Sequence, residues 1–108
     1  MKTYRGYPKE QAGAGKIDVI EKPDDNGSTP VKKPLEHVVR HSPTGMNWGY
    51  GGSGPSDTAL SILTDCFGPT MAEKYYQKFK RDVVAGLPIE AEWEITEQEI
   101  LSWLKRIG

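Results

Sequence analysis

The glycine-rich stretch at residues 48–55 reads WGYGGSGP and divides the chain into two unlike halves. Fifteen of the twenty Gly and Pro residues lie at or before Pro55, so the first half is rich in turns. After Pro55 the apolar residues recur at three- and four-residue spacing, which is typical of helices. Glycines beside two aromatic residues also let a ligand or another chain approach the backbone closely. The stretch therefore predicts both a boundary in the fold and a binding site.

Three helices are predicted in the second half. The first begins at Pro55, with Gly54 as its N-cap and Asp57 in its first turn, and it ends at the Gly-Pro pair 68–69. The second has capping-box spacing at residues 70–73 and runs toward Gly86 and Pro88. The third repeats the capping-box spacing at residues 96–99 and carries apolar residues at helical intervals to the end of the chain.

Short strands are predicted around these helices. Residues 16–22, KIDVIEK, form a β candidate that a turn at Asn26-Gly27 would close. Residues 35–42, LEHVVRHS, have a mixed pattern that fits a strand with one partly covered face, and residues 3–7, TYRGY, add a shorter strand. Residues 89–95, IEAEWEI, alternate strictly between apolar residues and glutamates, as a half-exposed strand does.

This order of elements predicts the α+β class, with a small, mainly antiparallel sheet and three helices packed on one face. The 108 residues fit a single domain, in which residues 1–55 form a part rich in strands and loops and residues 56–108 a part rich in helices.

Composition excludes several classes of protein. The net charge of −1 gives no general attraction to nucleic acid or to an anionic membrane. The N-terminus has no apolar signal segment and no run approaches the length of a membrane span, so we expect no membrane partner. Cys66 is the single cysteine, which rules out an internal disulfide and favours the cytoplasm.

Residues 41–63 read HSPTGMNWGYGGSGPSDTALSIL and resemble a family of short bacterial and phage proteins that is catalogued only as a domain of unknown function. WGYGGSGP before an Ala/Leu-rich helix is the most specific feature, and the similarity extends from TYRG to residues 100–103. The resemblance implies a bacterial or phage origin and a cytoplasmic setting, that of the host if the protein is phage-encoded. It implies no activity. Small phage proteins often bind a host protein, which is an argument by association.

Two nucleotide-binding motifs match the glycine stretch incompletely. Gly49, Gly51 and Gly54 have the G-x-G-x-x-G spacing, but one predicted helix is followed by another rather than by a parallel strand. A P-loop would need lysine where the chain has Pro55, and without that cation NTP hydrolysis is not expected. The helix start at Gly54 and Ser56 still offers backbone N–H groups to one phosphate or carboxylate.

The remaining patterns have ordinary structural explanations. His37 and His41 supply two metal ligands at most, so no metal site and no cofactor are predicted. His41 beside Ser53 or Ser56 matches no known nucleophile geometry, and the serines are better explained as helix caps, so no catalytic residue is assigned. Five glutamates form a patch that is by default a solvated face but would also suit a basic protein surface: Glu90, Glu92, Glu94, Glu97 and Glu99.

The sequence favours a non-enzymatic binding module over an enzyme. Its protein partner would contact the glycine-rich loop, whose aromatic, glycine and serine content resembles a contact surface. This hypothesis requires the rings of Trp48 and Tyr50 to lie at the surface. The alternative is a small anion- or nucleotide-binding protein or enzyme that uses the helix start. The candidate binding residues are Arg40, His41, Trp48, Tyr50, Gly51, Gly52, Ser53, Gly54 and Ser56.

Overall fold

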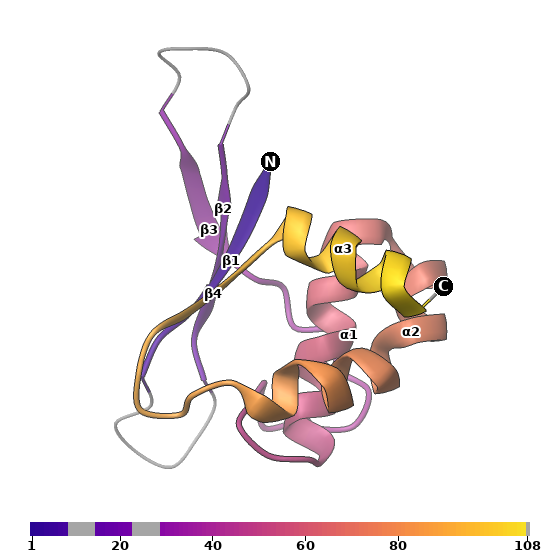
Figure 1. Ribbon diagram of the computed structural model, residues 1–108. Helices are drawn as coiled ribbons and strands as arrows, with labels where there is room; N and C mark the ends of the chain where they lie inside the picture. Colours follow the sequence, from indigo (N-terminus) through magenta and orange to yellow (C-terminus); the bar gives the residue numbers. More distant parts are fainter. Residues whose placement is uncertain (9–14, 23–28, 108) are drawn as a thin grey trace.

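The computed structural model describes residues 1–8, 15–22 and 29–107 (Figure 1). The strands are β1 (Lys2–Gly6), β2 (Ile17–Glu21), β3 (Val31–Pro34) and β4 (Trp93–Thr96). The helices are α1 (Ser53–Phe67), α2 (Pro69–Asp82) and α3 (Glu97–Ile107), with a short 3-10 turn, η1, at Val84–Gly86. The strands form one antiparallel sheet and the helices lie to one side of it, so the predicted α+β class is confirmed.

The sheet has the order β3-β2-β1-β4. Tyr4 in β1 stands opposite Val19 in β2 and Ile95 in β4, and all three side chains are buried. Because side chains alternate across a strand, the neighbouring positions point to the other face, where Arg5 pairs with Glu94. One face of the sheet thus supplies the core, and the opposite face carries charges.

Two of the predicted strands are confirmed and two need correction. Residues 3–7 overlap β1 and residues 16–22 contain β2. Residues 35–42 form no strand, because β3 ends at Pro34 and the chain then turns toward α1. Residues 89–95 are strand only from Trp93 onward. Trp93 and Ile95 are buried as predicted, but Ile89 is exposed. The predicted turn at residues 26–27 lies outside the described residues.

The helices begin and end close to their predicted positions. α1 starts at Ser53 with Gly52 as N-cap, two residues earlier than expected, so Asp57 lies beyond its first turn. α1 and α2 are joined by Gly68 alone, with φ of 91°. This tight connection places a proline at the start of α2, and no side chain caps that helix, so the predicted capping box at residues 70–73 is wrong.

Two tryptophans form the centre of the core. The rings of Trp48 and Trp93 meet edge to face with centroids 5.2 Å apart. Glycines make room for them, because an added Cβ would lie 2.1 Å from the ring of Trp93 at Gly6 and 2.1 Å from the ring of Trp48 at Gly15. The aromatic pair therefore depends on backbone segments that approach the rings closely.

The capping box at the start of α3 is confirmed. The N–H of Glu99 donates to Thr96 Oγ1 at 3.0 Å, and the N–H of Thr96 donates to Glu99 Oε1 at 3.0 Å. Thr96→Ala should lower the free energy of unfolding by about 1 kcal/mol. Thr70→Ala, which changes an exposed threonine at the start of α2, is the matched control and should cost less than about 0.5 kcal/mol. Urea denaturation measures both, and equal losses would contradict the capping role of Thr96.

Candidate functional site

Trp48 and Tyr50 are neighbours in the glycine-rich stretch but have opposite environments. Trp48 is 0% exposed and its Nε1 donates to the carbonyl of Pro88 at 3.0 Å. Tyr50 is 45% exposed. The requirement that both rings lie at the surface is therefore wrong for Trp48, because the large indole completes the core against Trp93. Tyr50 alone of the pair presents its ring to solvent.

Gly49 lets the backbone turn between buried Trp48 and exposed Tyr50. Its φ of +85° is a backbone conformation that side chains disfavour. A Cβ at Gly49 would also lie 2.4 Å from Ile89 Cγ1 and 3.0 Å from the carbonyl oxygen of Leu87. The N–H of Gly49 donates to the carbonyl of Val84 at 3.1 Å. The stretch is thus held tightly against residues 84–89 just before Tyr50.

The first turn of α1 fixes the other end of the loop. Gly54 is buried, and a Cβ there would lie 2.6 Å from the Cβ of Asn47. The hydroxyl of Ser56 is also buried and donates to the carbonyl of Gly52 at 2.8 Å. Thr58 Oγ1 accepts a hydrogen bond from the N–H of Asn47 at 2.9 Å. Gly54 and Ser56 therefore support the loop from beneath.

The same turn offers few donors to an anion. Pro55 has no N–H, and the N–H of Ser56 donates to the carbonyl of Gly52 at 3.0 Å. At most the amides of Ser53 and Gly54 are left from the first four helical positions. A phosphate at this position would have about half the usual number of backbone donors.

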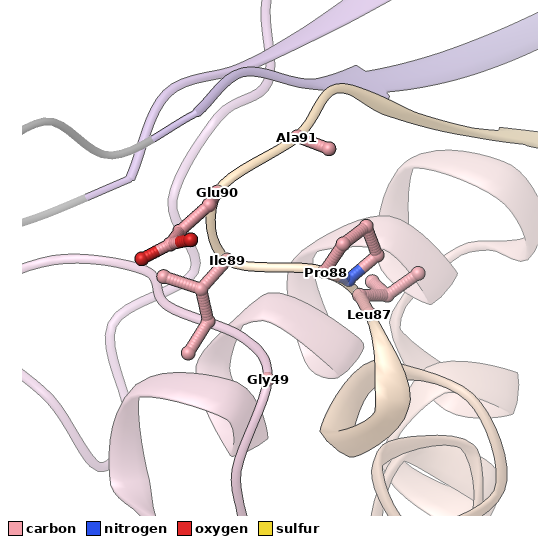
Figure 2. A pocket seen from close by; sticks show the side chains of 6 residues that line it. All are labelled: Gly49, Leu87, Pro88, Ile89, Glu90 and Ala91. Carbon is pink, nitrogen blue, oxygen red and sulfur yellow. The ribbon is translucent and has the colours of Figure 1, made fainter.

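A shallow hollow of about 480 Å³ lies beside the loop (Figure 2). Figure 2 shows the side chain of Ile89 reaching toward Gly49, with Glu90 next to it. Ile89 is 40% exposed, so two large exposed residues, Tyr50 and Ile89, adjoin Gly49 from opposite segments. We call residues 50–53 together with the lining of the hollow the loop surface. The lining consists of Gly49, Leu87, Pro88, Ile89, Glu90 and Ala91.

Arg40 and His41 contact α2 rather than turning freely into solvent. Arg40 Nη1 donates to both carboxylate oxygens of Glu73 at 2.8 Å. His41 Nε2 lies 2.8 Å from the hydroxyl of Tyr76, and the two rings stack with centroids 5.8 Å apart. His41 Nε2 bonds Tyr76 and the hydroxyl of Ser56 bonds the carbonyl of Gly52, so these two side chains do not form a nucleophile and base pair.

Asp57 holds a buried cluster of hydrogen bonds that its place in the helical pattern does not reveal. This side chain is fully buried and accepts hydrogen bonds from His37 Nε2 at 2.8 Å and from the N–H groups of His41 at 2.8 Å and Ser42 at 3.0 Å. The N–H of Arg40 also points at it. Burial raises the pKa of Asp57, but the hydrogen bonds outweigh it and leave the pKa below its ordinary value. One carboxylate thus ties residues 37–42 to α1.

Three further features bear on the function of the part of the chain that the structure describes: metal ligands, membrane-spanning helices and the Cys66 thiol. It contains no group of three His, Cys, Asp or Glu residues that would hold a metal ion. None of its helices has both the length and the apolar character needed to span a bilayer. Burial raises the pKa of the Cys66 thiol to about 11, so this cysteine stays protonated near neutral pH.

A family model described as "Family of unknown function (DUF6166)" matches residues 4–106. No curated protein and no solved structure matches. The family match extends from β1 to α3 and so includes every residue of the loop surface.

Proposed function

Since the chain belongs to DUF6166, a family of unknown function, we propose its role from the geometry: a non-enzymatic binding module that contacts a protein partner through the loop surface. The observation that carries this proposal is the pairing of Tyr50 and Ile89. Both residues are exposed and adjoin Gly49, and Ile89 also lines the hollow, although 39 positions separate the two in the chain. Exposed apolar residues that gather around a hollow mark a binding surface more often than single ones do.

The loop is built to hold its exposed residues in place. Trp48 anchors one end in the core, and the packing of Gly54 against Asn47 fixes the other. A loop that is already ordered loses less conformational entropy when it binds. Tyr50 adds a large ring with few rotatable bonds, which is a favourable contact residue for the same reason. The rigidity of the loop therefore supports recognition of a partner.

The predicted binding residues divide into contacts and supports under this proposal. Tyr50, Gly51, Gly52 and Ser53 would touch the partner, while buried Trp48, Gly54 and Ser56 hold the loop. Arg40 and His41 are exposed on the α2 side, where a partner that extended along that helix would reach them.

We further propose a bacterial or phage origin and a cytoplasmic setting, with a host protein as the partner. The resemblance of the glycine-rich stretch to short bacterial and phage proteins supports the origin. The single, half-buried Cys66, whose raised pKa keeps it as a thiol, suits a reducing compartment. The alternative ligand, a small anion or nucleotide at the start of α1, has weaker support because Pro55 reduces the donors there.

A selection of peptides tests the proposed function. A random peptide library is selected on the wild-type protein, and the best peptide is then measured against Tyr50→Ala/Ile89→Ala. We expect this double variant to bind at least about tenfold more weakly, since truncating central contact residues commonly costs more than 1 kcal/mol. Thermal unfolding should change little, because both side chains are largely exposed.

The matched control is Val31→Ala/Val39→Ala. These valines are 59% and 60% exposed on other parts of the surface, so their truncation should leave the peptide affinity unchanged. Equal losses in the two double variants, or a library that yields no peptide dependent on Tyr50 or Ile89, would contradict the proposal. Shifts of the amides at residues 52–57 on addition of inorganic phosphate or ATP would instead favour the anion alternative.

A further inference from the structure

We propose that the partner inserts a cationic side chain, arginine or lysine, into the hollow, with its charged end at the carboxylate of Glu90. The inference rests on the proposed function, because it names the chemistry of the partner at the same loop surface. It goes further by predicting which residue type in the partner is recognised.

The lining of the hollow has the two properties that such a side chain needs. Leu87, Pro88, Ile89 and Ala91 supply apolar wall, and Glu90 supplies the single charge. Figure 2 shows Glu90 beside Ile89 at the edge of the hollow. Arginine and lysine combine an apolar stem with a charged end, and they bury the stem while keeping the end at a polar group. The apolar stem of such a side chain would pack against the apolar wall, and its charged end would lie at the carboxylate of Glu90.

The charged side chains of the two segments that meet at the hollow have one sign. The two segments that form the loop surface and its surroundings, residues 47–54 and 84–93, contain Glu90 and Glu92 but no lysine or arginine. Neither glutamate makes an ion pair with any residue that the structure describes, whereas Glu94 in β4 pairs with Arg5. These two carboxylates contribute a negative potential at the hollow, which favours a positive group.

Other partner chemistries fit this hollow less well. An acidic side chain would be repelled by Glu90 and Glu92. A purely apolar side chain would cover Glu90 and remove water from its carboxylate without supplying a partner, which costs free energy. A cationic side chain fills the apolar wall and pairs the carboxylate at the same time.

Two small compounds test the charge directly. N-acetyl-argininamide carries the guanidinium, and N-acetyl-citrullinamide has nearly the same shape without the charge. Both are titrated into the isotope-labelled protein while the amide signals of Gly49, Glu90 and Ala91 are followed. We expect the arginine compound to bind about two- to fivefold more tightly than the citrulline compound, the range for a partly exposed ion pair. The preference should decrease as salt is added.

Variants assign the preference to Glu90. In Glu90→Gln the two compounds should bind equally, whereas Glu36→Gln, which changes an exposed glutamate after β3, should keep the wild-type preference. Equal binding of both compounds to the wild-type protein, or no shift of the three amides with either compound, would overturn the inference. So would a preference that survives in Glu90→Gln.

The peptide selection separates failure of this inference from failure of the proposed function. Selected peptides that need Tyr50 and Ile89 but contain no lysine or arginine would leave the protein-binding role standing and overturn the cationic contact. Peptides that share a lysine or arginine and lose affinity in Glu90→Gln support both proposals. Self-association of the protein that is lost in Tyr50→Ala/Ile89→Ala would mean that a second copy occupies the hollow, which overturns the inference.

Discussion

Trp48→Ala is expected to lower the free energy of unfolding by about 3 to 5 kcal/mol, the range for truncating a large aromatic side chain in a core. The ring is fully buried, packs edge to face against Trp93 and fits closely against Gly15. Its Nε1 also donates to the carbonyl of Pro88, one of the residues that line the hollow. Urea denaturation of the wild-type and variant proteins measures the loss.

Comparison with Tyr50→Ala distinguishes the residue that supports the loop from the residue that is exposed for contact. Tyr50→Ala removes an exposed ring two positions away and should cost less than about 1 kcal/mol. Trp48→Phe retains part of the packing but not the hydrogen bond, so it should fall between the two. A Trp48→Ala loss below 1 kcal/mol would mean that the indole contributes little to the core, and the rigid presentation of Tyr50 would lose its basis.

Asp57→Ala is expected to destabilise the protein by about 3 kcal/mol or more. The substitution leaves the N–H groups of His41 and Ser42 without their acceptor in a buried position and removes the partner of His37. Glu73→Gln, which weakens the exposed pair with Arg40 on the same segment, is the control and should cost at most about 1 kcal/mol. A similar, small loss in both variants would contradict the view that Asp57 ties residues 37–42 to α1.

The pH dependence of stability gives an independent check on Asp57. Because its pKa in the folded protein lies below its ordinary value of 3.8, its contribution is fully present above that value and is lost as the pH falls through the lower folded pKa. The wild-type protein should therefore lose stability below about pH 4 more steeply than Asp57→Asn does. Parallel curves for the two proteins would show that Asp57 has no lowered pKa.

Local signals in the sequence predicted most of the helical half. The Gly-Pro pair at residues 68–69 marks the end of α1, and the threonine and glutamate of residues 96–99 cap α3. The capping box predicted at residues 70–73 does not form although its spacing is identical. The one-residue connection between α1 and α2 leaves no room for a capping threonine. That connection is a property of helix packing, which spacing along the chain does not contain.

The predicted strand at residues 35–42 failed for a related reason. Its residue pattern allows a strand, but the backbone N–H groups of residues 40–42 bond to a buried carboxylate on α1 instead of to a neighbouring strand. The sign of this contact was an aspartate within the apolar run of a helix. Its partner segment cannot be read from the sequence, since the contact forms only when the fold is complete.

The sequence pointed to one of the two segments that form the candidate site. The glycine-rich stretch adjoins the hollow at Gly49, but composition alone did not distinguish buried Trp48 from exposed Tyr50. The hollow was missed because residues 89–91 had the pattern of a strand and because residues 87–91 lie far from the loop in the chain. The resemblance to a family of unknown function is confirmed by the family model over residues 4–106.

Site-specific photocrosslinking tests the central claim most directly. A benzoylphenylalanine is placed at position 50 or 53 in one pair of proteins and at position 31 in a control, and each is irradiated in cells that naturally produce the protein. A discrete crosslinked partner is predicted from positions 50 and 53 and not from position 31. No adduct at any position, or the same adducts from all three, would contradict the claim that the loop surface binds a protein partner.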